Sequence, residues 1–489
     1  MTSKKLAFAF LVTVIGMAGL VWGSDQISAD SKIKKEVTFS KDIAPIFYKN
    51  CAECHRPNDI APMSLITFKE SRPWARSIKE KVLTREMPPW SPDPKYGHFA
   101  NDARLSQQEI DTIVAWVDQG AKEGNPKDLP PAPEHTKGGW QIAKPDVVLE
   151  MAEEWTVEPG APDNYINFFI PTNFTEDKWI QAAEIIPGNR KVVHHVIAFI
   201  QTPEMMKRRE EMARNEGRPA GARGGSNSIM YLDGTLRRVK MDAPVVDDGC
   251  AQAPGNNSRA NRRSGGGGGE ENEGALLAGY APGKGIDVWP AGTAKRVPKG
   301  STIMFQMHYS SFRGDLEKPE KDRTKIGLVF AKEPPDKMII TAAVSNALFK
   351  IPAGAENHEV TACMTAPRDL VLITYMPHMH VRGKDMKYEV VYPDGRRETL
   401  LWVPKFNFNW QTMYYLEKPV IIPKGSKVIV TAHFDNSAKN KYNPDPKVEV
   451  RWGDPTYDEM MIGWFDLVLD NPMKMMKPAP SSAAKSEGK

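Results

Sequence analysis

Two cysteines and a histidine stand within five residues in the first part of the chain, in the order Cys51-Ala52-Glu53-Cys54-His55. Two thiols separated by two residues can each form a thioether to a haem vinyl group, and the histidine that follows then lies under the iron as its proximal ligand. A structural zinc half-site would need a second Cys or His pair at finger spacing, which does not follow, and a redox dithiol is the other alternative. The motif therefore predicts one covalent haem c held by Cys51, Cys54 and His55.

The sixth ligand of this haem has two candidates, Met63 and Met87. Met87 is favoured because Pro88 and Pro89, directly after it, hold the chain extended and keep it out of a helix. Another ligand, or simple core packing of both methionines, remains open. The Met-Pro-Pro segment and the helix expected after it resemble the small c-type cytochrome domains of many bacterial fusion proteins. Ligation by histidine and methionine would raise the haem potential and suit electron transfer.

Five further histidines are clustered in three apolar stretches: His194 with His195, His308, and His378 with His380. Imidazoles suit copper, zinc, iron and nickel, and a histidine in an apolar strand costs desolvation, so we expect a metal that the spacing alone does not name. His378 and His380 are two residues apart and share a face of a strand, which makes them a chelating pair. His194 and His195 would point to opposite faces of a regular strand, so they need a β-bulge or a strand end to bind one metal.

The remaining histidines and cysteines carry weaker signals. Three histidines stand alone and fit ordinary surface or core roles: His98, His135 and His358. His433 lies in an expected strand without a partner, so we expect it in the core or behind a metal ligand. Cys250 and Cys363 can pair in an oxidising compartment, which the sequence leaves open.

The first residues predict a secretory signal peptide over residues 1–24. Lys4 and Lys5 precede an apolar run over 6–22 that ends in two small residues, which is the layout of such a peptide. The run is slightly short for a spanning helix of about 20 apolar residues, so an uncleaved anchor is the weaker alternative, and we expect no stable membrane span after cleavage. Haem attachment of the c type takes place outside the bacterial cytoplasm, so the protein is expected to be periplasmic or secreted.

The length and charge of the chain set the scale. With 489 residues there is room for three domains of about 100 to 200 residues each. Lys and Arg number 65 against 61 Asp and Glu, so no nucleic-acid partner is indicated.

Residues 36–128 predict a small all-α domain. Its helices include one over 68–83 with Trp74 on the buried face, and one that begins at a capping box of Ser106 and Glu109.

The chain changes character after a proline-rich linker over 129–145. Short alternating runs punctuated by Pro and Gly then predict two all-β sandwiches, over 146–345 and 346–470. Within the first, residues 203–274 are charged and Gly-rich, and these residues and the tail 471–489 are expected to be disordered. The clearest strands are expected over 165–170, 191–200, 301–309, 371–375 and 428–434.

In order, the five clustered histidines and a later methionine resemble the ligands of the copper type II, ascorbate-dependent monooxygenases, the family of peptidylglycine α-hydroxylating monooxygenase and dopamine β-monooxygenase. In that family a His-His pair and a later His hold one copper, while a His-x-His pair and a Met in an Asp-Glu-Met segment hold the other. The resemblance covers about residues 145–466. It assigns two ligand sets: His194, His195 and His308 for one copper, and His378, His380 and Met460 of Asp458-Glu459-Met460 for the other.

This resemblance implies that both sandwiches are of jelly-roll type, with one copper on each and a solvent-filled gap between them. The expected fold class is multidomain, a small all-α c-type cytochrome followed by two all-β jelly-roll-like sandwiches. The chain departs from the animal enzymes in three ways: bracing cysteines are absent around the His-His pair, the insertion 203–274 is foreign to them, and a haem domain precedes the sandwiches. The substrate is therefore not carried over.

The expected function is a periplasmic haem- and copper-dependent monooxygenase that inserts one oxygen atom of O2 into a C–H bond of a small-molecule or peptide substrate. A thioether favours Cu(I) and leaves a coordination position open, so His378, His380 and Met460 would form the catalytic set. The all-imidazole set would store an electron. The haem would relay electrons from a periplasmic donor, replacing or supplementing an ascorbate-like reductant. The alternative is a non-catalytic electron-transfer or copper-binding protein.

Overall fold

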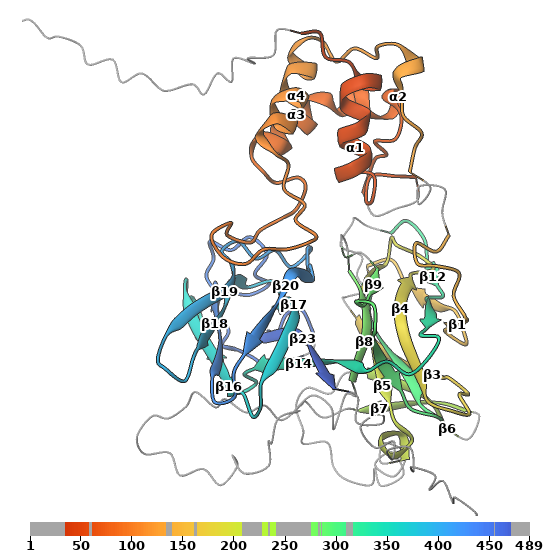
Figure 1. The fold of residues 1–489 in the computed structure, drawn as a ribbon, viewed down its shortest axis with the longest axis vertical. Coiled ribbons are helices and arrows are strands. Elements are labelled where there is room, and N and C mark those ends of the chain that lie inside the picture. The colour runs from red at the N-terminus through yellow and green to blue at the C-terminus, as the bar shows by residue number, and fades with distance from the viewer. Residues whose placement is uncertain are drawn as a thin grey trace, which may run out of the picture.

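The computed structural model is mostly β-sheet, with short helices found chiefly in the N-terminal part (Figure 1). The predicted signal peptide over 1–24 and the tail 471–489 lie outside the described residues. None of the described helices is long and apolar enough to cross a membrane. The structure describes residues 35–57, 61–133, 139–160, 164–207, 227–232, 235–240, 275–281, 284, 286–309, 316–453 and 455–470.

The few short helices between residues 39 and 128 confirm one detail of the sequence prediction and correct another. Ser106 caps the last helix and exchanges hydrogen bonds with Glu109, so the predicted capping box is confirmed. The helix predicted over 68–83 is broken by a 3₁₀ turn at Pro73, whose different period rotates Trp74 outward. Trp74 is 41% exposed, so its predicted place on the buried face is wrong. The helical segments are η1 (Phe39–Ile43, a π-helix), α1 (Ala44–Asn50), α2 (Phe68–Ser71), η2 (Arg72–Trp74), α3 (Ala75–Leu83), α4 (Gln107–Asp118) and η3 (Pro126–Asp128).

A six-stranded sheet carries three of the predicted strands at its centre. Its order is β7-β6-β3-β11-β5-β8, and β11 pairs antiparallel with both β3 and β5. The strands β6 and β7 fall within the insertion 203–274 that the sequence predicts to be disordered. Most of the remaining insertion lies outside the described residues. The bounds are β3 (Asn164–Pro171), β5 (Val193–Gln201), β6 (Asn227–Leu232), β7 (Thr235–Lys240), β8 (Ala275–Tyr280) and β11 (Thr302–Tyr309).

A longer sheet continues across the rest of the β region, in the order β1-β13-β4-β10-β14-β23-β17-β20, with β9 paired to β4. Its first half packs against the six-stranded sheet in one hydrophobic core, and its second half packs in another core against a four-stranded sheet of order β16-β21-β18-β19. These layers are consistent with β-sandwich domains. The long sheet comprises β1 (Val147–Glu150), β4 (Lys178–Ile186), β9 (Asp287–Val288), β10 (Thr293–Val297), β13 (Lys325–Phe330), β14 (Lys337–Ser345), β17 (Leu370–His378), β20 (Tyr414–Ile422) and β23 (Ile462–Asp470).

The four-stranded sheet closes the second core, and two small sheets add to the edges. The paired strands β2 and β12 form one small sheet, and β15 and β22 form the other. The bounds are β16 (His358–Thr365), β18 (Gly383–Val391), β19 (Arg397–Val403), β21 (Lys427–Phe434), β2 (Trp155–Val157), β12 (Glu320–Asp322), β15 (Lys350–Ile351) and β22 (Val450–Arg451).

The two β units are joined through β10 and β14, which pair in parallel. Ile339 of β14 packs in the first core and Val344 in the second, so this strand belongs to both. The buried ammonium of Lys295 on β10 donates to Thr341 Oγ1 of β14 at 2.8 Å and lies 3.6 Å from the Asp466 carboxylate on β23. A buried charge is tolerated only when it is paired and hydrogen-bonded, and this network supplies those partners where the units meet.

The segment that follows Met87 is anchored on the second unit. The Trp90 ring contacts Tyr414 of β20 with ring centroids 5.1 Å apart, and Phe99 packs against the same tyrosine at 5.5 Å. The amide of Asp93 donates to the Trp402 carbonyl at 2.8 Å. The segment thus adds two aromatic rings to the core of the second unit. Its backbone connects the helices to this unit (Figure 1).

The haem motif and the end of the linker also meet the β region. Gln141 and Ile142, in the linker, donate their amides to Glu184 Oε2 on β4 at 2.6 and 3.1 Å. Burial raises the pKa of Glu184, and the charge of Arg56, next to the haem histidine, opposes this rise. The CxxCH loop therefore lies within electrostatic reach of the first unit.

We expect Phe99→Ala to lower the free energy of unfolding by about 3–5 kcal/mol, because a buried phenylalanine is replaced by a cavity. Trp74→Ala, at a residue 41% exposed, should cost about 1 kcal/mol or less. Thermal unfolding followed by circular dichroism would measure both, and limited proteolysis would show whether the helical part separates from the second unit. Equal losses in the two variants would contradict the anchoring role of the 90–101 segment.

Candidate metal centres

The first histidine cluster is built at the place where β5 begins and β11 ends. His195 pairs with His308 across the two strands, while the next pair is Val193 with Tyr309, so His194 is an extra residue in the ladder. Such a β-bulge turns both side chains of a dipeptide toward one side. The prediction that adjacent histidines require a bulge or a strand end is confirmed, and the structure shows both at once.

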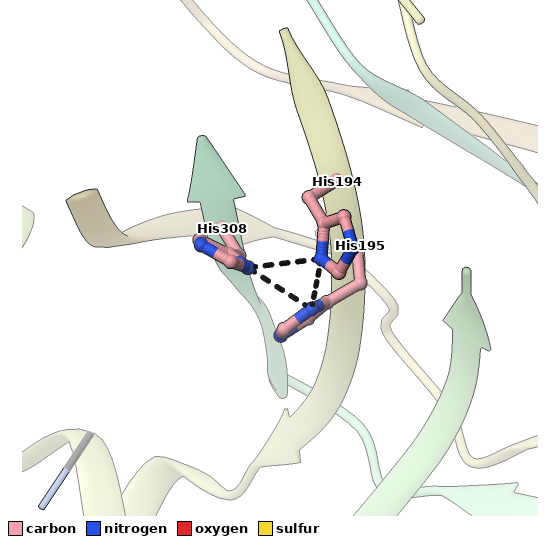
Figure 2. A group of neighbouring side chains, drawn as sticks. All are labelled: His194, His195 and His308. Atoms are coloured by element: carbon pink, nitrogen blue, oxygen red, sulfur yellow. Dashed lines mark hydrogen bonds between the residues drawn. The ribbon is translucent and has the colours of Figure 1, made fainter. Parts of the chain in front are cut away.

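The three imidazoles meet through the same ring atom, as Figure 2 shows. The Nδ1 atoms of His194 and His195 are 3.2 Å apart, those of His194 and His308 3.1 Å, and those of His308 and His195 3.2 Å. The three residues form a possible metal-ligand group, and all three are buried.

This triangle cannot be satisfied by hydrogen bonds alone. In a neutral imidazole each ring nitrogen is either a donor or an acceptor. With three Nδ1 atoms, two must have the same role, so at least one of the three close pairs sets two protons or two lone pairs against each other. A cation bound by three lone pairs removes the conflict. Tetrahedral ligands about 2.0 Å from a metal are about 3.3 Å apart, close to the distances observed.

Metal binding requires a neutral imidazole, and the environment of His195 favours that form. The pKa of His195 is held well below its usual value, by burial first and then by the neighbouring histidines. These neighbours include His378 and His380, so the second histidine pair lies within electrostatic reach of the first cluster.

A buried carboxylate holds the two strands together beside this cluster. Asp322 accepts hydrogen bonds from the Tyr309 hydroxyl at 2.9 Å and from the amide of Asn189 at 2.9 Å. Tyr309 directly follows His308, and Asn189 leads into the strand that carries His194. Burial raises the pKa of Asp322, while the donors around it oppose the rise. Asp322 therefore fixes the strand ends on which the cluster depends.

The second set of predicted ligands is brought together by the register of β17 and β23. His378 is the last residue of β17 and pairs with Ile462 at the start of β23. Met460 stands two residues before Ile462 and His380 two residues after His378, so both lie just beyond the same end of this strand pair. The rings of His378 and His380 are 5.3 Å apart and nearly perpendicular. The predicted ligands of the second site thus come from His378 and from the two segments just beyond this end of the strand pair.

Hydrogen bonds orient both imidazoles of this second set. His378 Nδ1 contacts Gln411 Oε1, and His380 Nδ1 lies 3.2 Å from the carbonyl of Asp458. Oxygens of this kind only accept, so both Nδ1 atoms carry the proton and both Nε2 atoms present a lone pair. His380 Nε2 is buried and has no hydrogen-bond partner among the described residues. Burial lowers the pKa of His378 to about 4, with smaller effects from Gln411 and His308.

Two aromatic rings lie between the clusters. Tyr165 of β3 stacks on His308 with centroids 4.3 Å apart and is 6.4 Å from the His380 ring. Phe408 stacks on His194 at 4.9 Å and is 6.0 Å from His380. Each of these two rings thus stacks on a histidine of the first cluster and lies near His380 of the second, while the solvent-filled gap implied by the resemblance stays a prediction.

The haem motif forms a compact loop after α1. The amide of His55 donates to the Cys51 carbonyl at 2.8 Å, and Cys51 and Cys54 form no disulfide. His55 Nδ1 lies 3.2 Å from the carbonyl of Met63, which leaves Nε2 as the other ring nitrogen for a ligand. Burial lowers the pKa of His55. Met87 donates its amide to the Lys81 carbonyl at the end of α3.

Other sequence-predicted residues lie apart from the two clusters. His433 is held between Asp385, at 3.0 Å, and Glu359, at 3.4 Å, on the sheet that contains β21. Cys363 is disulfide-bonded, and Cys250 lies outside the described residues. His98 is exposed and His358 is half-buried, in agreement with ordinary roles, while His135 is outside the described residues.

Several residues at the site were not found by sequence reasoning. Gln411 and Phe408 come from a loop without a recognisable pattern, and only the fold brings them to the histidines. Tyr165 lies in a predicted strand, but its pairing with His308 depends on the register. Asp322 carries no local signal. Glu459 stands next to a predicted ligand, although the motif gave it no role.

Comparison with known proteins adds little. No protein-family model matches the chain, and no curated protein matches it. Solved structures with partial likeness include a PBCV-1 VP54 structure fitted into a virophage Sputnik reconstruction, at TM-score 0.20 and 6% identity over 68% of this chain and 95% of that one. The VP2 subviral particle of infectious bursal disease virus has TM-score 0.17 and 7% identity over 68% and 74%. Likeness this low supports no argument.

Replacing His308 with alanine should remove one of the three nitrogen ligands and prevent stable metal binding at the first cluster. We expect the copper-reconstituted His308→Ala protein to contain one copper fewer per chain than the wild type, by elemental analysis after desalting. His433→Ala is the control, since the imidazole of His433 pairs with Asp385 and Glu359 apart from the two clusters, and it should keep the full content. The same loss in both variants, or in neither, would contradict the assignment.

Proposed function

We propose that the protein is a periplasmic or secreted haem- and copper-dependent monooxygenase, with one covalent haem c and two coppers. The observation that carries this proposal is the buried triangle of three Nδ1 atoms, together with a second histidine pair whose Nε2 atoms are free to bind a metal beside Met460. In this proposal the helical part is a small c-type cytochrome and the two β units are jelly-roll-like sandwiches. The disulfide at Cys363 supports an oxidising compartment.

The N-terminal loop fits a haem. Its two thiols and its histidine have the required order, and the Nδ1 contact of His55 with the Met63 carbonyl orients Nε2 toward a ligand in the way that outer hydrogen bonds orient metal-binding histidines. The same contact places the Met63 backbone on the side of the imidazole away from Nε2. A sixth ligand must come from the opposite face of the haem, which supports Met87 over Met63.

The residues around the second set suit a redox metal with an open position. Copper bound there would supply one-electron redox chemistry and activation of O2. His378 and His380 would present Nε2 lone pairs in fixed orientations, and the thioether of Met460, in an apolar cluster with Ile462 and Trp464, would favour the reduced ion. Tyr165 and Phe408 would limit the access of water between the two clusters.

The charges of the CxxCH loop act on buried groups of both β units. Arg56 opposes the raised pKa of Glu184 on the first unit, and Glu53 contributes, after burial and other charges, to the raised pKa of Tyr415 on β20 of the second. A periplasmic donor or an ascorbate-like reductant would deliver electrons to the haem, which would pass them to the β region. The substrate would be a small molecule or peptide with a C–H bond to be hydroxylated.

A second candidate is a non-catalytic electron-transfer or copper-binding protein. It is favoured by one observation, the aromatic rings of Tyr165 and Phe408, which contact both clusters where a substrate would otherwise lie. In this case the metals would accept electrons from the haem without forming an oxygenated product.

The two candidates differ in one measurable product. Reduced, copper-loaded protein given labelled O2 and a panel of small-molecule and peptide substrates should incorporate one labelled oxygen atom per product. Met460→Leu should lower product formation by more than about tenfold, since a proposed ligand of the reactive copper is lost. Met461→Leu, a neighbouring core methionine, should leave it nearly unchanged because the volumes match. Copper binding without labelled product from any substrate would favour the second candidate.

The axial haem ligand is tested by its spectrum. Met87→Leu should abolish the weak absorption band at the red edge that marks sulfur ligation of ferric haem, because the proposed sulfur donor is gone. Met63→Leu is the control and should keep the band, since the backbone carbonyl of residue 63 still contacts His55. Loss of the band in the Met63 variant alone would transfer the assignment.

A further inference from the structure

The chain leaves β17 at His378, so the amides that follow have no strand partner. A buried amide without an acceptor costs free energy comparable to a lost hydrogen bond. Here one side chain supplies the acceptors. Glu459 is fully buried, and its carboxylate accepts from the amide of His380 at 2.8 Å and from the amide of Arg382 at 2.6 Å.

The same carboxylate reaches the other ligand segment. The amide of Met460 lies 3.3 Å from Glu459 Oε2, the oxygen that also accepts from His380. One oxygen atom thus connects the backbones of the imidazole ligand and the thioether ligand. The backbone of Glu459 is itself fixed, since its amide donates to the Arg451 carbonyl at 3.1 Å and its carbonyl accepts from Gly453 at 3.2 Å.

A buried arginine completes this arrangement. Arg382 is 1% exposed; its Nε donates to Asn436 Oδ1 and its guanidinium to the Tyr457 carbonyl, each at 2.9 Å. It lies within electrostatic reach of the Glu459 carboxylate. Glu459 and Arg382 therefore each connect the segment after β17, which carries His380, to the segment before β23, which carries Met460.

We propose that Glu459 is a positioning residue for the second metal set, which fixes the distance between the His380 imidazole and the Met460 thioether through their backbone amides. The inference rests on the proposed copper site. Glu459 suits this role because three backbone amides, those of His380, Arg382 and Met460, converge on its two side-chain oxygens. A glutamine has a single side-chain oxygen to accept hydrogen bonds. Its NH2 group, itself a donor, would lie against one of the backbone N–H donors. Loss of Glu459 releases Met460, while His378 and His380 keep their own orienting contacts.

The test uses the full chain loaded with Cu(I) and X-ray absorption at the copper edge, which reports sulfur scattering directly. Wild-type protein should show a copper–sulfur shell, and Met460→Leu should lose it. Glu459→Gln should lose most of this shell and bind the second copper about 10–100-fold more weakly, while the first copper is retained as an internal sign of folding. Glu389→Gln is the matched control, because Glu389 is a buried glutamate of β18 in the same unit whose carboxylate pairs with Lys387 and Arg397.

Each outcome decides the matter. If the wild type has no copper–sulfur shell, the proposed ligand set fails and the positioning role fails with it. If the wild type has the shell and folded Glu459→Gln keeps it at full strength, the positioning role alone is overturned. If Glu459→Gln does not fold, Glu459→Asp, which keeps the charge but is shorter by one methylene, replaces it: loss of sulfur supports the proposal, and retention overturns it. If Glu459→Gln and Glu459→Asp both lose both coppers, Glu459 is required for folding, and the positioning role is overturned as well.

Discussion

Three nitrogen atoms of the same kind, held 3.1–3.2 Å apart in a buried place, set the strongest constraint in this protein. No assignment of protons satisfies all three pairs, so the folded chain keeps a polar conflict in its interior unless a cation lies there. The β-bulge at His194 and the contacts of Asp322 hold the three imidazoles in the positions that produce this conflict. Buried polar groups are ordinarily paired, which makes such a triangle hard to explain as packing alone.

The two clusters present different ring nitrogens. The first uses Nδ1, the atom close to the backbone, so its geometry follows the positions of β5 and β11 directly. The second leaves Nε2 free and holds Nδ1 by Gln411 and by the Asp458 carbonyl, so its geometry depends on side-chain orientation and on the contacts around it. The first cluster depends on the strand register and on Asp322, whereas the second depends on Gln411, which comes from a loop, and on the Asp458 carbonyl.

The sequence predicted what local chemistry determines. The capping box at Ser106, the strands that carry the histidines, and the need for a bulge at His194 all follow from spacing and period, and the structure has them. Trp74 was misplaced because a 3₁₀ turn at Pro73 changes the period of the helix. The positions of Phe408 and Asp322 could not be predicted, since they depend on contacts between segments far apart in sequence. The cytochrome, the copper sites and the reaction stay predictions.

The pairing of β10 with β14 has a mechanical consequence. Two sandwiches connected only by a flexible strand could swing apart, but here a shared sheet and the buried Lys295 network resist any hinge at that line. Opening would expose an ammonium group whose partners lie on both sides. The separation of the two histidine clusters is thus set by the rigidity of the sheet. The loop that carries Phe408 is not part of a strand, so it can move without opening the sheet. Access to the space between the clusters therefore depends on this loop.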